Sequence, residues 1–336
     1  MTADSDSVNR PDPAGNQDGD SPELVALSSQ AVQHWGSPIT TGDDIAAGIA
    51  DDVPNLSRRR MRALRELLRS RKFLFGSILF GAVVLAAIFA PLIAHYNPDF
   101  PNYNDLNQNP SSAHIFGTDY LGRDLWSRVV WGGRTSLPAG CLIVVLSFCI
   151  GVPWGIVAGF GGRLIDDLLM RLIDVLLAFP GIILAFSIVA ILGPGIPSVV
   201  VALGIAGIPG YARVARASTL STRELDYVAA ARAQGASAAH IMRAHVFRNI
   251  VDPLVILATL NLSGAILAAS ALSFLGIGTQ LPASDWGTML SNGYNYMFES
   301  YSQVVFPAAV IIVTVLGINL MGDALGEALN PRTHQR

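Results

Sequence analysis

Long apolar runs without a charged side chain dominate the chain from residue 74 onward. The uncharged runs are residues 74–94, 135–162, 175–212, 253–284 and 300–322. A helix needs about 20 apolar residues to cross a bilayer, so four of the runs suit one crossing each. The run 175–212 would be about 57 Å long as a single helix, too long for one crossing. A turn signal, Gly-Pro-Gly-Ile-Pro at 193–197, divides it, and the pattern predicts about six transmembrane helices.

The distribution of arginine supports this topology. With six crossings and a cytoplasmic amino terminus, the inner segments are 1–73, about 161–173, 213–250 and 324–336, which hold 19 of the 22 Lys and Arg residues. The other three, Arg123, Arg128 and Arg134, lie in the first outer loop. This is the positive-inside pattern. It predicts a multi-pass protein with both termini in the cytoplasm.

The first 73 residues change sign along their length. Residues 1–56 contain ten acidic residues and one basic residue, Arg10, and this composition predicts a disordered acidic cytoplasmic tail. Between Arg58 and Lys72 there are eight basic residues and one acid. We expect a basic amphipathic juxtamembrane helix at 57–73, ahead of a first transmembrane helix at 74–95. A role in fixing the orientation of the first transmembrane helix would explain most of these basic residues equally well.

The sequence offers no catalytic centre. Lys72 is the only lysine and follows Arg71, whereas a P-loop needs a lysine directly after its second glycine. His240 and His245 are five residues apart, which is wrong for a metal pair on one helix face. We therefore expect a chain that is not an enzyme, with no catalytic residues, no metal and no cofactor of its own. Any ATP hydrolysis must occur in a partner.

The inner segment 213–250 carries helix signals. Ser221 and Glu224 form a capping box that predicts a helix beginning near Thr222. Gly235 is placed to end it, and Ser237 to cap a second helix that runs to about Phe247. The expected product is a helix–Gly–helix knob in the cytoplasm that docks onto a soluble partner. An ordinary structured cytoplasmic loop is the alternative.

Residues 227–235, Tyr-Val-Ala-Ala-Ala-Arg-Ala-Gln-Gly, resemble the EAA loop of ABC-importer permeases. In those proteins the loop forms a coupling helix that sits in a cleft of the ATP-binding subunit. Here Ala229 replaces the usual Glu, and His245, Phe247 and Arg248 replace the usual Ile, Leu and Pro, while Gly235 is kept. The resemblance implies an ATPase-coupling loop made by Leu225, Tyr227, Val228, Ala229, Ala230, Ala231, Arg232, Gly235, Ala236 and Ser237.

The resemblance extends over about residues 62–332. The motifs are Phe-Gly-Thr-Asp-Tyr-Leu-Gly-Arg-Asp at 116–124, Arg-Leu-Ile-Asp-Val-Leu-Leu-Ala-Phe-Pro at 171–180, Ala-Leu-Ser-Phe-Leu-Gly at 271–276, Trp-Gly at 286–287 and Asn-Leu-Met-Gly-Asp at 319–323. Together they resemble the C-type subunit of the dipeptide/oligopeptide/nickel permease family. That likeness implies an all-α integral membrane protein with the type I ABC-importer permease fold, located in the bacterial cytoplasmic membrane.

The same resemblance implies partners and a cargo. The expected partners are a second, B-type permease, one or two ABC ATPase subunits that bind ATP and Mg, a substrate-binding protein on the outer face, and membrane lipid, with no nucleic acid. The cargo implied is a di- or oligopeptide. An ion-coupled secondary carrier or channel acting without an ATPase is the alternative. The chain shows no clear internal repeat and no charge in mid-span, features that carriers often have.

Within the membrane part, residues 135–330 form the predicted permease core, which contains the coupling loop 213–250. Gly151, Gly155 and Gly159 recur every four residues and predict close helix packing. Asn261 and Asn319 are polar residues within apolar runs, and such residues usually face a bundle interior or cavity. We expect both to face the pore, although an interhelical hydrogen bond would explain each.

Two outer segments are rich in aromatic residues. Residues 96–134 are the predicted extracytoplasmic loop, with an interfacial helix that carries Trp126 and Trp131. Residues 276–303 contain Trp286, Tyr294, Tyr296, Phe298 and Tyr301. Both segments fit a platform for a binding protein, and both fit plain anchors at the membrane interface.

Overall fold

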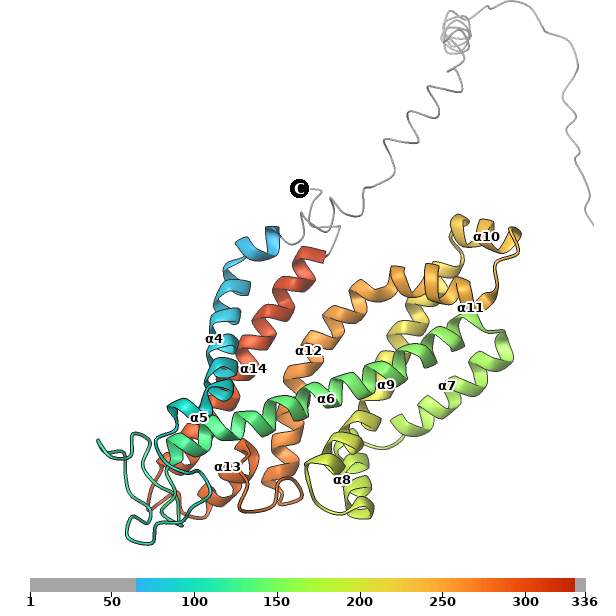
Figure 1. Ribbon diagram of the computed structural model, residues 1–336. Coiled ribbons are helices and arrows are strands. Elements are labelled where there is room, and N and C mark those ends of the chain that lie inside the picture. The colour runs from blue at the N-terminus through green and yellow to red at the C-terminus, as the bar shows by residue number, and fades with distance from the viewer. Residues whose placement is uncertain (1–64, 330–336) are drawn as a thin grey trace, which may run out of the picture. The chain divides into compact units, whose positions relative to one another are not determined.

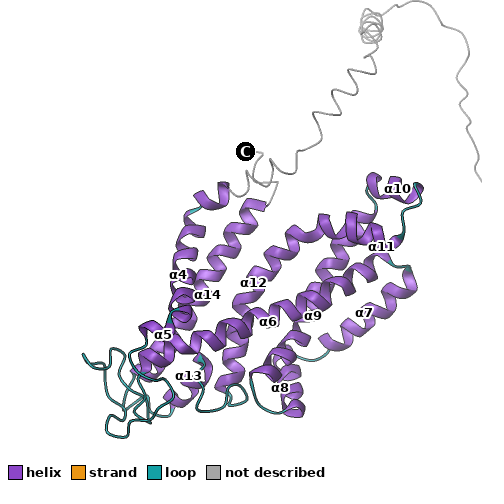
Figure 2. Ribbon diagram, viewed as in Figure 1, coloured by secondary structure: helices purple, strands orange, loops and turns teal. Residues whose placement is uncertain are grey.

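The computed structural model describes residues 65–329, and within that range it is built from helices (Figures 1 and 2). The predicted acidic tail 1–56 and the start of the predicted juxtamembrane helix lie outside the described residues. The helices are α4 (Arg71–Ile88), α5 (Ala90–Ile93), α6 (Leu125–Phe160), α7 (Arg163–Leu177), α8 (Gly181–Leu192), α9 (Ile196–Arg223), α10 (Asp226–Ala233), α11 (Ala238–His240), the π-helical η1 (Ile241–Val246), α12 (Phe247–Phe274), α13 (Trp286–Tyr294) and α14 (Ser302–Leu329).

Five helical segments of the described chain are long and apolar enough to cross a membrane. They are α4, α6, α9, α14 and the continuous segment Ala238–Phe274, which joins α11, η1 and α12. The pair α7 and α8, bent by 85° at its junction, makes a sixth crossing if counted as one broken span. The prediction of an all-α membrane protein with about six transmembrane helices is therefore confirmed.

The long run 175–212 is broken where the sequence predicted. Helix α8 ends at Leu192 and α9 begins at Ile196. Gly193 and Gly195 between them have φ values of +88° and +143°, a backbone region that glycine enters without the clash of a Cβ atom. The bend before α8 was not predicted. Pro180, directly before α8, has no N–H to donate and disfavours helical geometry at Phe179, so α7 ends before these residues, at Leu177.

Helices α6 and α9 are in backbone contact. A Cβ atom on Gly155 would lie 2.2 Å from the Ala212 carbonyl oxygen, and one on Gly151 would lie 2.7 Å from the Ile208 oxygen. A Cβ on Gly159 would meet Thr219 at 2.8 Å. The predicted close packing of this glycine face is confirmed, and its partner is α9.

The outer segment between α5 and α6 is fixed by buried charges. Arg123 donates to Asp119 at 2.7 Å, and Arg128 donates to the Pro98 carbonyl oxygen at 2.6 Å. Asp124 caps α6 by accepting from the Ser127 N–H at 2.8 Å. Because this cap lies so early, the stretch with the two tryptophans, expected as a separate interfacial helix, forms the first turns of α6 instead.

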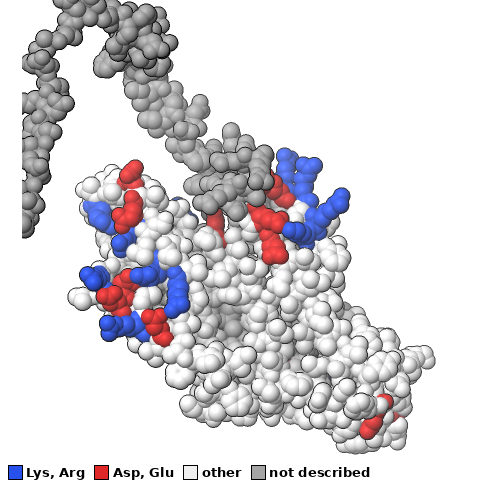
Figure 3. Space-filling view, turned by 180° about the vertical axis from the view of Figure 1, so that it is seen from behind, with Lys and Arg blue, Asp and Glu red and all other residues white. Residues whose placement is uncertain are grey.

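Charged side chains gather at one end of the molecule. Figure 3 shows two groups of them there, separated by a broad uncharged surface from the opposite end. The bidentate pair Arg216–Asp166, at 2.5 and 2.6 Å, and the pair Arg213–Asp174 at 2.8 Å join α9 to α7. Lys72 and Glu327 pair at 2.5 Å and join α4 to α14. An uncharged belt of this kind suits the hydrocarbon core of a bilayer.

Candidate coupling surface and membrane pocket

The predicted knob is present, but its first helix starts later than expected. Ser221 and Thr222 belong to α9, which continues to Arg223, and Leu225 is the N-cap of α10. The capping-box prediction is therefore wrong. Thr219 and Thr222 are buried, so packing along α6 extends α9 past the local start signal. The second predicted helix also does not stop near Phe247, because it continues through η1 into α12.

Gly235 ends α10 in a Schellman motif. Its φ is +80°, its N–H donates to the Arg232 oxygen at 3.0 Å, and the Ala236 N–H donates to the Ala231 oxygen at 3.1 Å. This is the 5→2 and 6→1 pair of hydrogen bonds that defines the motif. Ser237 then caps α11 by accepting from the His240 N–H at 3.3 Å. The turn therefore uses Gly235 for its backbone conformation, not for space.

The inner face of α10 is anchored in the membrane part. Val228 is fully buried in a cluster with Tyr211 of α9, Ile241 of η1 and Ile250 of α12. The Arg232 guanidinium lies 5.6 Å from the ring centre of Phe160 in α6. Helix α10 thus contacts three membrane helices through side chains, and a shift of α10 would have to break these contacts or carry the three helices with it.

Tyr227 adds a polar tie between α10 and α12. Its hydroxyl accepts a 2.6 Å hydrogen bond from the Asn249 side chain. Burial raises the pKa of the Tyr227 phenol, and the bond from Asn249 opposes that rise. The tie keeps the ring in place although 43% of the side chain is exposed.

The outer face of α10 is bare. It protrudes at the charged end of the molecule (Figure 1). The predicted coupling residues that are exposed there are Leu225, Tyr227, Ala229, Ala230, Arg232, Gly235 and Ser237. Val228, Ala231 and Ala236 instead pack against the core cluster beneath. The small alanines leave a flat surface, and its docking role stays a prediction at this point.

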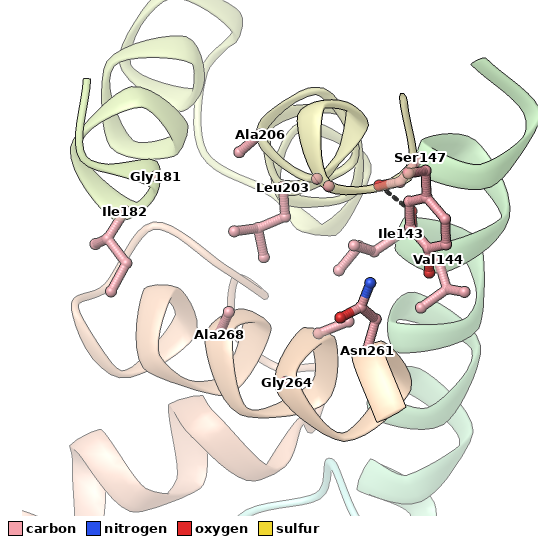
Figure 4. A pocket seen from close by; sticks show the side chains of 14 residues that line it. Ile143, Val144, Ser147, Gly181, Ile182, Leu203, Ala206, Asn261, Gly264 and Ala268 are labelled. Atoms are coloured by element: carbon pink, nitrogen blue, oxygen red, sulfur yellow. Dashed lines mark hydrogen bonds between the residues drawn. The ribbon is translucent and has the colours of Figure 1, made fainter. Parts of the chain in front are cut away.

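A pocket of about 370 Å³ opens between α6, α8, α9 and α12 (Figure 4). Its lining is mostly apolar or glycine. Asn261 of α12 points into it, and Tyr211 and Ser147 also line it. The volume falls within the usual range for small-molecule sites. Sequence reasoning named Asn261 but missed Tyr211, whose only signal was a tyrosine inside an apolar run.

Asn319 lies elsewhere. Its side-chain oxygen accepts a 2.6 Å hydrogen bond from the Ser263 hydroxyl, which links α14 to α12. The structure therefore places the two asparagines apart, one lining the pocket and one in an interhelical bond. A pore-facing role for either stays a prediction.

The aromatic residues of the second outer segment divide into two groups. Trp286 is 1% exposed, and its indole donates to the Val129 oxygen at 2.9 Å, so it is a core residue and part of no surface platform. Tyr294, Phe298 and Tyr301 are exposed. Tyr296 stacks on Tyr120 of the first outer segment at 5.1 Å. The exposed three form the part of this segment that could contact a binding protein or membrane lipid, and the platform stays a prediction.

Comparison with known proteins identifies the family of the chain. Residues 151–335 match the family of binding-protein-dependent transport system inner membrane components, and residues 60–110 match the N-terminal transmembrane domain of oligopeptide transport permease C. A Brucella suis protein that carries the provisional name of a peptide transport system permease is 45% identical over 86% of this chain and 98% of its own length.

Two further relatives have more specific names. The dipeptide transport system permease DppC of Alkalihalophilus pseudofirmus is 40% identical over 80% of this chain and 89% of its own. The di/tripeptide permease DppC of Pseudomonas aeruginosa is 42% identical over 76% and 87%.

A solved structure agrees in fold. A chain of the MetNI methionine ABC transporter, in an inward-facing conformation, superposes with a TM-score of 0.50 and 20% identity over 61% of this chain and 98% of its own. This chain therefore belongs to the binding-protein-dependent transport system inner membrane components, the transmembrane permease subunits of ABC importers.

Proposed function

We propose that this chain forms half of the translocation pathway for di- or oligopeptides in an ABC importer and is coupled to separate ATPase subunits through α10. The peptide cargo is supported by the names of relatives that this chain matches over most of their length. The coupling role is supported by one observation above all: α10 is anchored on its inner face and bare on its outer face.

The anchoring of α10 gives a physical route for coupling. ATP binding closes the ATPase subunits, and the closure displaces α10. Because Val228 and Tyr227 tie α10 to α9 and α12, the displacement tilts both helices. Both also line the pocket, so the tilt changes which side of the membrane the pocket faces. This is alternating access driven from the cytoplasm.

The remaining components belong to other chains. ATP and Mg bind to one or two ATPase subunits, and a second, B-type permease completes the pathway. A substrate-binding protein delivers the cargo at the outer face. The chain itself sits in a bacterial cytoplasmic membrane with both termini inside, as the arginine distribution favours.

Purification and reconstitution test the proposal. The tagged chain, extracted in mild detergent, should retain a second permease and ATPase chains that mass spectrometry identifies. In proteoliposomes with the binding protein, the complex should import a radiolabelled peptide only when ATP is supplied on the side of the membrane where the ATPase subunits lie. A chain that purifies alone and moves solute without ATP would be a carrier or channel, and the coupling role of α10 would be wrong.

A further inference from the structure

The polar side chains of the pocket are few, and they differ in what they already bind. The Ser147 hydroxyl donates to the Ile143 oxygen at 2.9 Å and to the Gly204 oxygen at 2.8 Å. It is thus occupied by the backbone of α6 and α9. Asn261 and Tyr211 are the polar groups left to meet a ligand.

Tyr211 has an unusual environment. The residue is 1% exposed, and its hydroxyl is buried without a hydrogen bond in the described part of the chain. Asn261 lines the same pocket, but no hydrogen bond joins the two side chains in the described part of the chain. Buried hydroxyl groups almost always have a partner, because leaving one unpaired is costly. A group that enters the pocket would supply it.

The walls leave room for a polymer backbone. Gly210 and Gly264 line the pocket, and a Cβ atom built on either would meet no atom within 4 Å. The missing side chains keep the space beside Asn261 open. An extended chain could lie against the helices there without a clash.

Resting on the peptide cargo proposed above, we infer that this pocket binds the backbone of a passing peptide. The Asn261 amide donates to the carbonyl oxygen of one solute residue and accepts from the N–H of the same residue, and the Tyr211 hydroxyl makes a third hydrogen bond. A primary amide carries a donor and an acceptor side by side, which matches the N–H and C=O of one residue in an extended chain and ignores the solute's side chains. The site therefore selects for peptide bonds and tolerates any sequence.

The same tyrosine connects the pocket to the ATPase side. Tyr211 belongs to the core cluster that holds Val228 of α10, and it also lines the pocket. A solute that orders the hydroxyl also orders this cluster. Binding in the pocket should accordingly stimulate ATP hydrolysis even without the binding protein.

The test uses the purified complex of this chain with its partner permease and ATPases. The probe is a tritiated alanine di-, tri- or pentapeptide, whichever the wild-type complex imports in proteoliposomes. Its Kd is then measured by scintillation proximity on the complex without binding protein. Tyr211→Phe and Asn261→Leu should each raise Kd about three- to tenfold, the loss expected for one or two neutral hydrogen bonds. Peptide-stimulated ATPase activity should fall in parallel.

Two controls separate recognition from folding. Thr219→Val also removes a buried, unpartnered hydroxyl from α9, but Thr219 does not line the pocket, so its Kd should equal that of the wild type. Neither hydroxyl deletion should lower the thermal midpoint of the complex, since an unpaired buried hydroxyl stabilises nothing. An ester analogue of the probe, which lacks the peptide N–H, should bind the wild type more weakly but should bind Asn261→Leu as well as the peptide does.

The outcomes are distinct. Import by the wild type without saturable binding, or wild-type Kd values in both pocket variants, would overturn the inference and leave the proposed function intact. Failure of the wild type to import any of the three peptides would contradict the peptide cargo itself, and the inference with it.

Discussion

The Asn249 side chain donates a 2.6 Å hydrogen bond to the Tyr227 hydroxyl, so the exposed helix α10 is tied to the start of α12. The tie is polar, whereas the contact through Val228 is apolar. It can therefore be removed without opening a cavity. Removing this hydrogen bond therefore tests how strongly a displacement of α10 is transmitted to α12.

Tyr227→Phe should loosen that transmission. The variant loses one neutral hydrogen bond, worth about 1 kcal/mol, and keeps the ring. We expect near-normal ATPase activity with more ATP hydrolysed per peptide imported, measured in the same proteoliposomes. Ser187→Ala, which removes an exposed hydroxyl that donates to the Ile183 oxygen of its own helix α8 at 2.9 Å, is the control and should behave as wild type. An unchanged ratio in Tyr227→Phe would remove the tie from the coupling route.

Gly235→Val should uncouple ATPase docking from transport. A β-branched residue at φ +80° is strained by at least about 1–2 kcal/mol, so the Schellman turn would open and α10 would lose its orientation. Gly235→Asn is the control, because asparagine tolerates this region and a Cβ atom there meets nothing within 4 Å. Co-purification of the ATPase and ATP-driven uptake are the measurements. Normal uptake by the valine variant would contradict the prediction.

Gly155→Ala should destabilise the membrane part. The new methyl group would lie 2.2 Å from a backbone oxygen of α9, and overpacking of this kind costs about 1–3 kcal/mol. The apparent melting temperature in detergent, followed by fluorescence-detected size exclusion, should drop. Gly81→Ala in α4, where a Cβ meets nothing within 4 Å, should leave it unchanged. Equal melting temperatures for the two variants would mean that α6 and α9 separate easily.

Arg128→Met should loosen the outer segment. The guanidinium is 1% exposed and donates to the Pro98 oxygen at 2.6 Å, and a hydrogen bond from a charged group is worth about 2 kcal/mol. Protease added outside spheroplasts should cut the segment faster in this variant. Arg134→Met removes an exposed arginine that stacks on Trp131 at 4.8 Å and should not change the rate. Equal cleavage in both would show that Arg128 does not hold the segment.

Much of the fold could be predicted because a bilayer restricts the possibilities. Uncharged runs of spanning length, arginine on one side and the Gly-Pro-Gly break at 193–195 led to about six helices. The 85° bend between α7 and α8 was not predicted, although Pro180 is evident in the sequence. The charged residues of 163–174 suggested a short inner loop, whereas ion pairs such as Asp166–Arg216 let that stretch form a helix against α9.

The candidate sites divide in the same way. The Gly235 turn was predictable because φ > 0 is a local property of the backbone. The start of α10 was not, since burial of Thr219 and Thr222 against distant residues overrode a local cap. Tyr211 could not be singled out, because the lack of a partner for its hydroxyl is a fact of three-dimensional packing.

The glycine contact between α6 and α9 has a mechanical consequence. Sliding of packed helices requires side chains that can change rotamer at the contact, and here backbone meets backbone. We therefore expect α6 and α9 to move together as one rigid unit, which carries a wall of the pocket and the base of α10. Rotation would then occur at hinges outside this unit. The junction at Pro180 and the π-helical turn η1, at the base of α12, are the places where the backbone is already irregular enough to provide one.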